Sequence, residues 1–508
     1  MTKFTPDGAN LGVTRLTRRA KDSKSVLSLS CDAMDLVESS RMFVEDAIRK
    51  AQPVYGLTTG LGARVTETLD KDQLTDFSYQ TLRGRAHSLG EQLPVEIVRG
   101  AMIARINTMM TGASGVSPEV PEFMVRCFNR NITPVVGSIG SIGASDLCMG
   151  ATMGLSFIGA GKMQMPDGEV APSTQVLHSE GMKPLVLGPR DGLALANHSC
   201  FSASISAFVV DEANHLFNCL QSGAAMTMEA MNANLSPISE TVMSVSQHQS
   251  HVKTAAHLRE ILAGSGLNNS RVAKKIQDPL SIRNIVQVHG SFFTALSAAR
   301  SAVNAELNSV SDNPIVDFKN RCMVSTGGYL STELTLCLES IARALDMVIT
   351  TLLARLSKLT SERYSGLPMF LASPAANSNG FAPVMKIVES LVSRIKRCLT
   401  PVSIWPSVNA DGVEDVLSNS FERAQSLLEA LNYCRQLVSI EMIMAAQGLE
   451  LSERLSESSQ FVQTAFESIR YKVSALEDDR PMFSDIQNLA VLLGSEEFPL
   501  LDHRSLSS

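Results

Sequence analysis

The sequence predicts a mainly α-helical fold in which a mixed N-terminal domain leads into a bundle of long helices. The first observation is an apolar stripe at helical spacing that lasts about six turns. Its members are Leu334, Leu338, Ile341, Leu345, Val348, Leu352 and Leu356. Residues 203–220, 292–310 and 427–438 carry similar patterns, and aromatic residues make up only 5% of the chain. Because such helices must bury their apolar faces against one another, these observations favour a bundle.

The chain divides in this prediction into two domains, residues 1–200 and residues 201–508. The first is a mixed α/β domain, and the second contains the long helices. Ser30 is placed to cap the first helix, and turn-forming residues interrupt the chain near the end of the first domain. The expected elements there are helices over 33–50, from about 71 onward and over 94–111, and a short hairpin within 160–190.

Length and composition exclude several classes of protein. The 508 residues are 44% hydrophobic, enough for a large core, yet no stretch reaches the ~18 uninterrupted apolar residues of a membrane span. The net charge of −7 argues against nucleic-acid binding, which relies on clustered Lys and Arg. The nine cysteines form no CxxC pair, and no apolar signal segment is present at the start. We therefore expect a soluble cytoplasmic protein with reduced thiols.

Two glycine-rich segments are the first candidates for a functional site. Residues 137–147 (GSIGSIGASDL) run from extended chain into an apolar helical stretch, and residues 55–62 (YGLTTGLG) form a loop. Taken alone, a glycine-rich turn before a helix is usually only a turn. A tyrosine on such a loop either packs against the loop or acts as a general base if its neighbours favour the phenolate.

Together with further segments, these two resemble the ordered motifs of the histidine and phenylalanine ammonia-lyases. The further segments are residues 191–198 (DGLALANH), 277–283 (QDPLSIR), 308–314 (NSVSDNP) and 413–415 (VED). The resemblance covers nearly the whole chain and implies the ammonia-lyase/fumarase-like helical fold. It also implies a homotetramer whose active sites draw residues from three subunits.

The resemblance assigns roles to several side chains. Tyr55 would be the catalytic base, on a loop that family members contribute across a subunit interface. Ser145 and Asn197 would be polar supports beside the reacting groups. Arg283, in the same motif as Gln277, would bind the substrate carboxylate, for which an always-charged planar guanidinium is well suited.

Other positions concern the rest of the substrate. Glu414 falls where histidine-specific members have a glutamate that faces the imidazole, which indicates an imidazole-like or cationic substrate. Tyr329 and Phe381 would line the pocket. Arg85 falls near the position of the ring-binding histidine of the family, with His87 as the alternative two residues away.

The sequence also departs from the family pattern. In the family an Ala-Ser-Gly triad cyclises to the electrophilic prosthetic group methylidene-imidazolone (MIO). Here Asp146 follows Ala144 and Ser145 directly, so the glycine whose amide nitrogen closes the ring is missing. Leu280 stands where ammonia-lyases have a catalytic tyrosine, and His198 replaces a glycine, facing either the core or a reshaped pocket. We therefore expect no cofactor.

These departures suit a substrate that does not need MIO. A quaternary ammonium has no lone pair to add to MIO, and trimethylamine leaves readily as a neutral amine. The enzyme then has to abstract the β-proton, hold the carboxylate and accommodate the cation. In this respect the sequence is similar to the ergothionases, which convert ergothioneine, the betaine of 2-thiolhistidine, into thiourocanate and trimethylamine. The resemblance thus implies an amino-acid betaine as the substrate.

Two alternatives stay open. The first is an MIO-dependent ammonia-lyase or aminomutase acting on histidine or an aromatic amino acid, if residues 144–146 cyclise. The second is a non-catalytic protein that binds an amino-acid-like ligand. A metal site is not expected, because His248, His251 and His257 have no cysteine or carboxylate to complete a ligand set.

Overall fold

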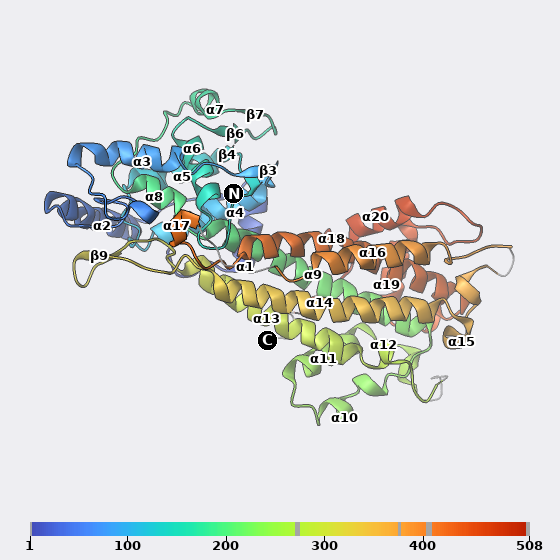
Figure 1. Ribbon diagram of the computed structural model, residues 1–508. Helices are drawn as coiled ribbons and strands as arrows, with labels where there is room; N and C mark the ends of the chain where they lie inside the picture. The colour runs from blue at the N-terminus through green and yellow to red at the C-terminus, as the bar shows by residue number, and fades with distance from the viewer. Residues whose placement is uncertain (1–2, 270–274, 374–376, 403–408, 504–508) are drawn as a thin grey trace. The chain divides into compact units, whose positions relative to one another are not determined.

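The chain forms two compact units, and the computed structural model describes residues 3–269, 275–373, 377–402 and 409–503 (Figure 1). The first unit comprises Met1–Asp211, Ala299–Leu338 and Pro401–Gln425, and the second comprises Glu212–Ala298, Glu339–Thr400 and Ser426–Ser508. The chain first passes from the first unit to the second after Asp211, near the boundary expected at residue 200. It passes between the units several times, so each unit is assembled from three segments. Most of the positions where the chain passes between the units lie inside helices, so no linker in the sequence marks them.

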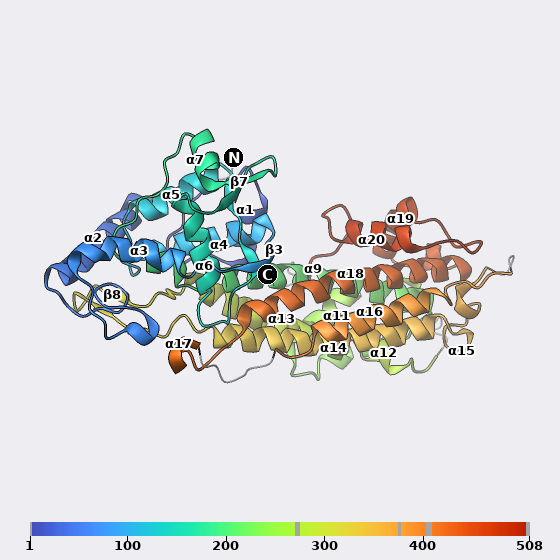
Figure 2. The same cartoon turned by 45° about the horizontal axis from the view of Figure 1, so that its top comes forward.

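Long helices dominate the second unit. They are α9 (Cys200–Ala230), α13 (Ile285–Asn308), α14 (Thr332–Leu359), α16 (Val384–Cys398) and α18 (Ser420–Leu451), with shorter helices α10 (Glu240–Met243), α11 (Gln249–Ile261), α12 (Leu280–Arg283), α15 (Glu362–Ser365), α19 (Gln460–Lys472) and α20 (Phe483–Leu493). Figures 1 and 2 show α9, α13, α14 and α18 running side by side in this unit. The seven stripe positions on α14 are each at most 1% exposed, which confirms the predicted bundle.

Helix α9 is a core helix of this bundle. The stretch Asp191–Ala230 is long and apolar enough to cross a membrane by length and composition, but 94% of its most apolar window is buried within the protein. A buried ion pair lies beside it: Arg355 of α14 donates to Glu441 of α18 at 2.7 Å, and Thr227 of α9 donates to the same carboxylate at 3.2 Å. Interhelical burial, not lipid, therefore accounts for the apolar character of α9.

The first unit combines short helices with small sheets, as predicted. Its helices are α1 (Val13–Lys21), α2 (Cys31–Arg49), α3 (Leu74–Arg83), α4 (Val95–Met109), α5 (Glu119–Asn129), α6 (Leu147–Phe157), α7 (Ser173–Ser179), α8 (Asp191–Ala196) and α17 (Asn409–Gly412). Its strands are β1 (Lys3–Phe4) paired with β2 (Val26–Leu27), β3 (Leu89–Gln92) paired with β5 (Gly137–Ile139), β8 (Ile315–Asp317) paired with β9 (Cys322–Val324), and a sheet of β4 (Thr133–Pro134), β6 (Lys162–Gln164) and β7 (Val170–Pro172).

Local predictions hold in this unit. The Ser30 side chain accepts a hydrogen bond from the Ala33 amide at 3.2 Å, which confirms the predicted cap; α2 begins at Cys31, two residues before the predicted start. Strands β6 and β7 form the hairpin expected within 160–190, with Met163 opposite Ala171.

Close packing of α3, α6 and α8 positions the candidate site. A Cβ atom on Gly192 of α8 would lie 2.0 Å from the Ser78 carbonyl oxygen of α3, and one on Gly150 of α6 would lie 2.6 Å from the Ala196 carbonyl oxygen of α8. Only glycine permits these approaches. They place the start of α6 and the end of α8 at the wall of one cavity.

Candidate active site

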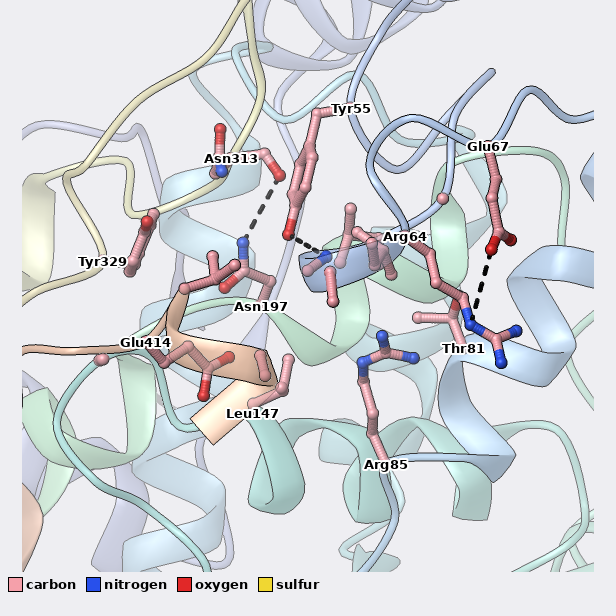
Figure 3. A pocket seen from close by; sticks show the side chains of 18 of the residues that line it. Tyr55, Arg64, Glu67, Thr81, Arg85, Leu147, Asn197, Asn313, Tyr329 and Glu414 are labelled. Atoms are coloured by element: carbon pink, nitrogen blue, oxygen red, sulfur yellow. Dashed lines mark hydrogen bonds and ion pairs between the residues drawn. The ribbon is translucent and has the colours of Figure 1, made fainter. Parts of the chain in front are cut away.

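A cavity of about 760 Å³ in the first unit gathers side chains from distant parts of the sequence. Five of the predicted site residues line it: Tyr55, Arg85, Asn197, Tyr329 and Glu414 (Figure 3). They come from the glycine-rich loop, the end of α3, the end of α8, the segment after β9 and the segment after α17. Within this single chain, the fold brings together residues that only the family resemblance had connected.

Tyr55 lies on a hydrogen-bonded loop that also supplies a donor to its hydroxyl group. The Val54 carbonyl oxygen accepts hydrogen bonds from three following amides, and Gly56 has a φ of +63° that suits glycine. The Tyr55 phenolic oxygen in turn accepts a hydrogen bond from the Gly62 amide at 3.1 Å (Figure 3). A donor in this position stabilises negative charge on that oxygen once its proton has left.

Asn197 is positioned by the turn at residues 312–314. Its side-chain amide donates to the Asn313 carbonyl oxygen at 3.5 Å, and Asn197 is only 8% exposed. The turn is fixed from the other side, because the Thr326 amide donates to the Asn313 side chain at 3.0 Å and its hydroxyl donates to the Asp312 carbonyl oxygen at 2.6 Å. Thr326 therefore links this turn to the segment that carries Tyr329.

A buried ion cluster anchors the same turn to the core. Asp312 accepts hydrogen bonds from Arg105 at 2.7 and 2.8 Å, from Arg190 at 3.2 Å and from the Ser114 hydroxyl at 2.8 Å. The three charged side chains are fully buried. Although burial acts in the opposite direction, the charge of Arg105, its hydrogen bonds and then Arg190 lower the pKa of Asp312. Burial lowers the pKa of Arg190 to about 10, against the charge of Asp312.

Arg85 and Glu414 bring opposite charges into the cavity without pairing. Among the described residues, neither side chain forms a hydrogen bond or ion pair, and both point toward the space beneath Tyr55 (Figure 3). Burial lowers the pKa of Arg85, while Tyr55 and Glu414 oppose the shift. Burial, then Tyr55 and Glu414, raise the pKa of Tyr329, so this phenol stays protonated at neutral pH. His87, the alternative to Arg85, is exposed and does not line the cavity.

His198 is a core residue that faces away from the cavity. It is fully buried, its Nε2 lies 3.1 Å from the Leu195 carbonyl oxygen, and its Nδ1 accepts from the Cys200 amide at 3.2 Å. These partners require a neutral ring with the proton on Nε2. Burial, with a contribution from the charge of Arg105, lowers the pKa of His198 to about 3. Of the two orientations left open by the sequence, the structure has the core-facing one.

The residues at positions 144–146 do not fit the MIO group. Its closure would bond the Asp146 amide nitrogen to the carbonyl carbon of Ala144. That amide instead donates to the His198 carbonyl oxygen at 2.8 Å. The buried Asp146 carboxylate accepts from the Ser141 hydroxyl at 2.7 Å and from the Ser202 amide and hydroxyl at 2.8 and 2.7 Å. Ring closure would break the first contact and pull the carboxylate from the others, at the N-cap residue that directly precedes α6.

Four predicted site residues do not line the cavity. Ser145 is 3% exposed and directs its hydroxyl to the His198 carbonyl oxygen at 3.3 Å. Arg283 donates to Gln277 at 2.6 Å in the second unit, and Phe381 of that unit is 1% exposed. A search of the described residues for three or more His, Cys, Asp or Glu side chains able to hold one metal ion finds none.

Three contributors to the site carry no clear signal in the sequence. The Gly62 amide and the Asn313 and His198 carbonyl oxygens act through the backbone, which every residue type possesses. Their roles depend on where the fold places them, so residue identity does not reveal them.

Comparison with known proteins extends these observations over the whole chain. Residues 11–471 match the family model for aromatic amino acid lyase. The chain is 31% identical over 493 residues to a histidine ammonia-lyase from Stigmatella aurantiaca, covering 97% of this chain and 96% of the relative. It resembles the structure of ergothionase from Treponema denticola in complex with desmethyl-ergothioneine sulfonic acid, with a TM-score of 0.94, 25% identity and 98% and 99% of the two chains covered. It also resembles tyrosine aminomutase from Streptomyces globisporus, with a TM-score of 0.91, 26% identity and 98% of each chain covered.

Proposed function

Because the chain belongs to the aromatic amino acid lyase family, we propose that it is a carbon–nitrogen lyase that eliminates trimethylamine from ergothioneine without MIO. The observation that carries the proposal is Asp146, which stands where the ring-closing glycine is missing and is bound to Ser141 and Ser202 at the start of α6. A primary amine is a poor leaving group and needs an electrophilic cofactor. A quaternary ammonium departs without one.

Tyr55 takes the proton in the proposed reaction. Its phenolate removes a proton from the substrate β-carbon, and the electrons of that C–H bond form the double bond between the α- and β-carbons. The bond between the α-carbon and nitrogen breaks, and its electron pair leaves with neutral trimethylamine. The Gly62 amide, at 3.1 Å from the phenolic oxygen, offsets the negative charge of the base.

The remaining side chains hold the substrate. Glu414 accepts from a ring N–H group, and the face of Tyr329 lies against the trimethylammonium, as cation–π contacts require. Asn197 is a polar support held by the turn at Asn313. Arg283 binds the carboxylate, and Gln277 and Phe381 complete the pocket, from neighbouring subunits of a homotetramer. Nine free cysteines agree with the cytoplasmic location we propose.

The first expected result is substrate selectivity. Incubated separately with ergothioneine and with histidine, the protein should release trimethylamine and thiourocanate from the first and nothing from the second, as read by NMR. Ammonia from histidine would support the second candidate, an MIO-dependent ammonia-lyase or aminomutase, which the identity to a histidine ammonia-lyase favours. Tight binding of ergothioneine with no turnover would indicate a binding protein.

The second expected result concerns the cofactor. The intact protein should show the full mass of its sequence, because MIO formation would remove two water molecules. Ser145→Ala removes one long hydrogen bond of 3.3 Å and should lower kcat by no more than about tenfold. An MIO enzyme would instead lose nearly all activity with this serine. A mass short of two waters, or inactivation by Ser145→Ala with the fold intact, would contradict the MIO-independent mechanism.

A further inference from the structure

Arg85 lines the cavity, and its charged guanidinium group has no partner among the described residues of the first unit. Among the described residues, its guanidinium forms neither a hydrogen bond nor an ion pair, although its backbone amide closes the end of α3 by donating to Leu82. Two other buried arginines of this unit do have partners for their guanidinium groups: Arg105 donates to Asp312 at 2.7 and 2.8 Å, and Arg99 donates to the Ala20 and Phe128 carbonyl oxygens at 3.0 and 3.2 Å. Arg85 therefore has its donors available for a ligand.

Glu414 is the complementary group. It also lines the cavity, it is half-buried, and no partner is found for its carboxylate in the described part of the chain. Among the described residues, Tyr55, Glu414 and Cys148 are close enough to raise the pKa of Arg85 against the larger effect of burial. A free guanidinium and a free carboxylate in one cavity match a ligand edge that presents an acceptor beside a donor.

We infer that Arg85 recognises the sulfur atom of the substrate by donating a hydrogen bond to it, while Glu414 accepts a hydrogen bond from the adjacent ring N–H group. This inference rests on the proposed function. In an imidazole-2-thione the sulfur lies between two ring N–H groups, so one edge of the ring offers both an acceptor and a donor. Arg85 is thereby a specificity-determining residue for the thio-substituted ring.

The substrate carboxylate is the competing ligand for Arg85. Two observations favour the sulfur. Figure 3 shows the Arg85 and Glu414 side chains both directed into the part of the cavity beneath Tyr55, and Glu414 is the group proposed to bind the ring. In addition, every α-amino acid carries a carboxylate, so a carboxylate-binding Arg85 would not distinguish between substrates, whereas the unpaired Glu414 in the same cavity would repel that carboxylate.

The arrangement also works against substrates without sulfur. A plain imidazole offers no acceptor beside the N–H group that Glu414 binds, so the guanidinium would lose water and gain no partner. Sites that leave a buried polar group unpaired reject the incomplete ligand strongly. Arg85 would thus help to exclude histidine and its betaine.

The test compares two betaines that differ only in sulfur: ergothioneine and the trimethylbetaine of histidine. Wild type, Arg85→Met and Arg85→Lys are assayed for trimethylamine release and, by calorimetry, for binding of each betaine. Arg85→Met should lower kcat/KM and affinity for ergothioneine by about 10- to 100-fold and leave those for the histidine betaine unchanged or raised. Arg85→Lys, which keeps the charge but not the planar donor group, should fall between. Arg83→Gln, on an exposed neighbour at the end of α3, is the matched control.

The outcomes separate this inference from the proposed function. Equal losses for both betaines would assign Arg85 to the carboxylate or to the structure of the cavity and overturn the inference, as would no loss for either. Binding of ergothioneine without turnover would contradict the proposed lyase function. The ratio of the affinities for the two betaines would still show whether Arg85 recognises the sulfur atom. A wild type that binds neither betaine would overturn both.

Discussion

Tyr55→Phe should reduce trimethylamine release from ergothioneine by about 10³-fold in kcat, within the range expected for loss of a general acid–base group. The phenyl ring fills the same space and leaves the hydrogen bonds to the Val54 carbonyl oxygen in place, so the proton acceptor is lost together with its hydrogen bond from the Gly62 amide. In the wild type, the Tyr55 oxygen accepts a hydrogen bond from the Gly62 amide at 3.1 Å, and Tyr55 lines the cavity together with Asn197 and Glu414. The measurement is kcat by NMR of released trimethylamine, together with calorimetric binding of ergothioneine, which should be nearly unchanged.

Tyr471→Phe is the matched control, because Tyr471 is 84% exposed and belongs to the second unit. It should leave kcat and binding at wild-type values. A Tyr55→Phe protein that retains more than a tenth of wild-type kcat would show that another group takes the β-proton. A parallel loss of binding would mean that the hydroxyl positions the substrate instead of deprotonating it.

Asp312→Ala should destabilise the protein by about 3–5 kcal/mol, the cost of breaking a buried ion pair from one side. The substitution leaves Arg105 and Arg190 buried without their carboxylate and frees the turn that holds Asn197. We therefore expect a lower urea midpoint and, in the protein that remains folded, a lower kcat. The readouts are the fluorescence or circular dichroism midpoint in urea and kcat measured in its absence.

Asp346→Ala provides the comparison, because the Asp346–Lys396 pair is partly exposed and such pairs contribute about 0–1 kcal/mol. The pH dependence adds a second check. Since the folded pKa of Asp312 is lowered, its contribution is fully present above the ordinary aspartate pKa of about 4 and is lost as pH falls through the lower folded value. The difference between wild type and Asp312→Ala should therefore shrink only in acid. An equal urea midpoint for the two proteins at neutral pH would contradict the anchoring role.

The sequence was sufficient for the helical architecture and for most of the cavity. The stripe from Leu334 to Leu356 predicted a buried helix, and α14 buries all of it. The motifs predicted Tyr55, Asn197 and Glu414 as neighbours, and the structure places them in one cavity. Both predictions were possible because the helical stripe and the motifs consist of residue types at fixed spacings within short segments, which can be recognised without knowing the tertiary structure.

Other features depended on contacts between distant segments. The sequence left His198 undecided, and burial against Leu195 and Cys200 made it a neutral core residue. It did not distinguish Arg85 from His87, and the end of α3 directs only Arg85 into the cavity. Arg283 and Phe381 lie in segments that resemble family motifs, yet they belong to the second unit and do not line the cavity of this chain.

The sequence by itself determined the family motifs, the helical bundle and the missing glycine after Ser145, since each depends on residue types at fixed spacing. Only the tertiary structure decided what Asp146 does in its place. Its amide meets the His198 carbonyl oxygen and its carboxylate meets Ser202, more than 50 residues away in the sequence. Hydrogen bonds of this kind form between backbone and side-chain groups that many sequences share, so their partners are fixed by the packing of α6 against α8 and α9.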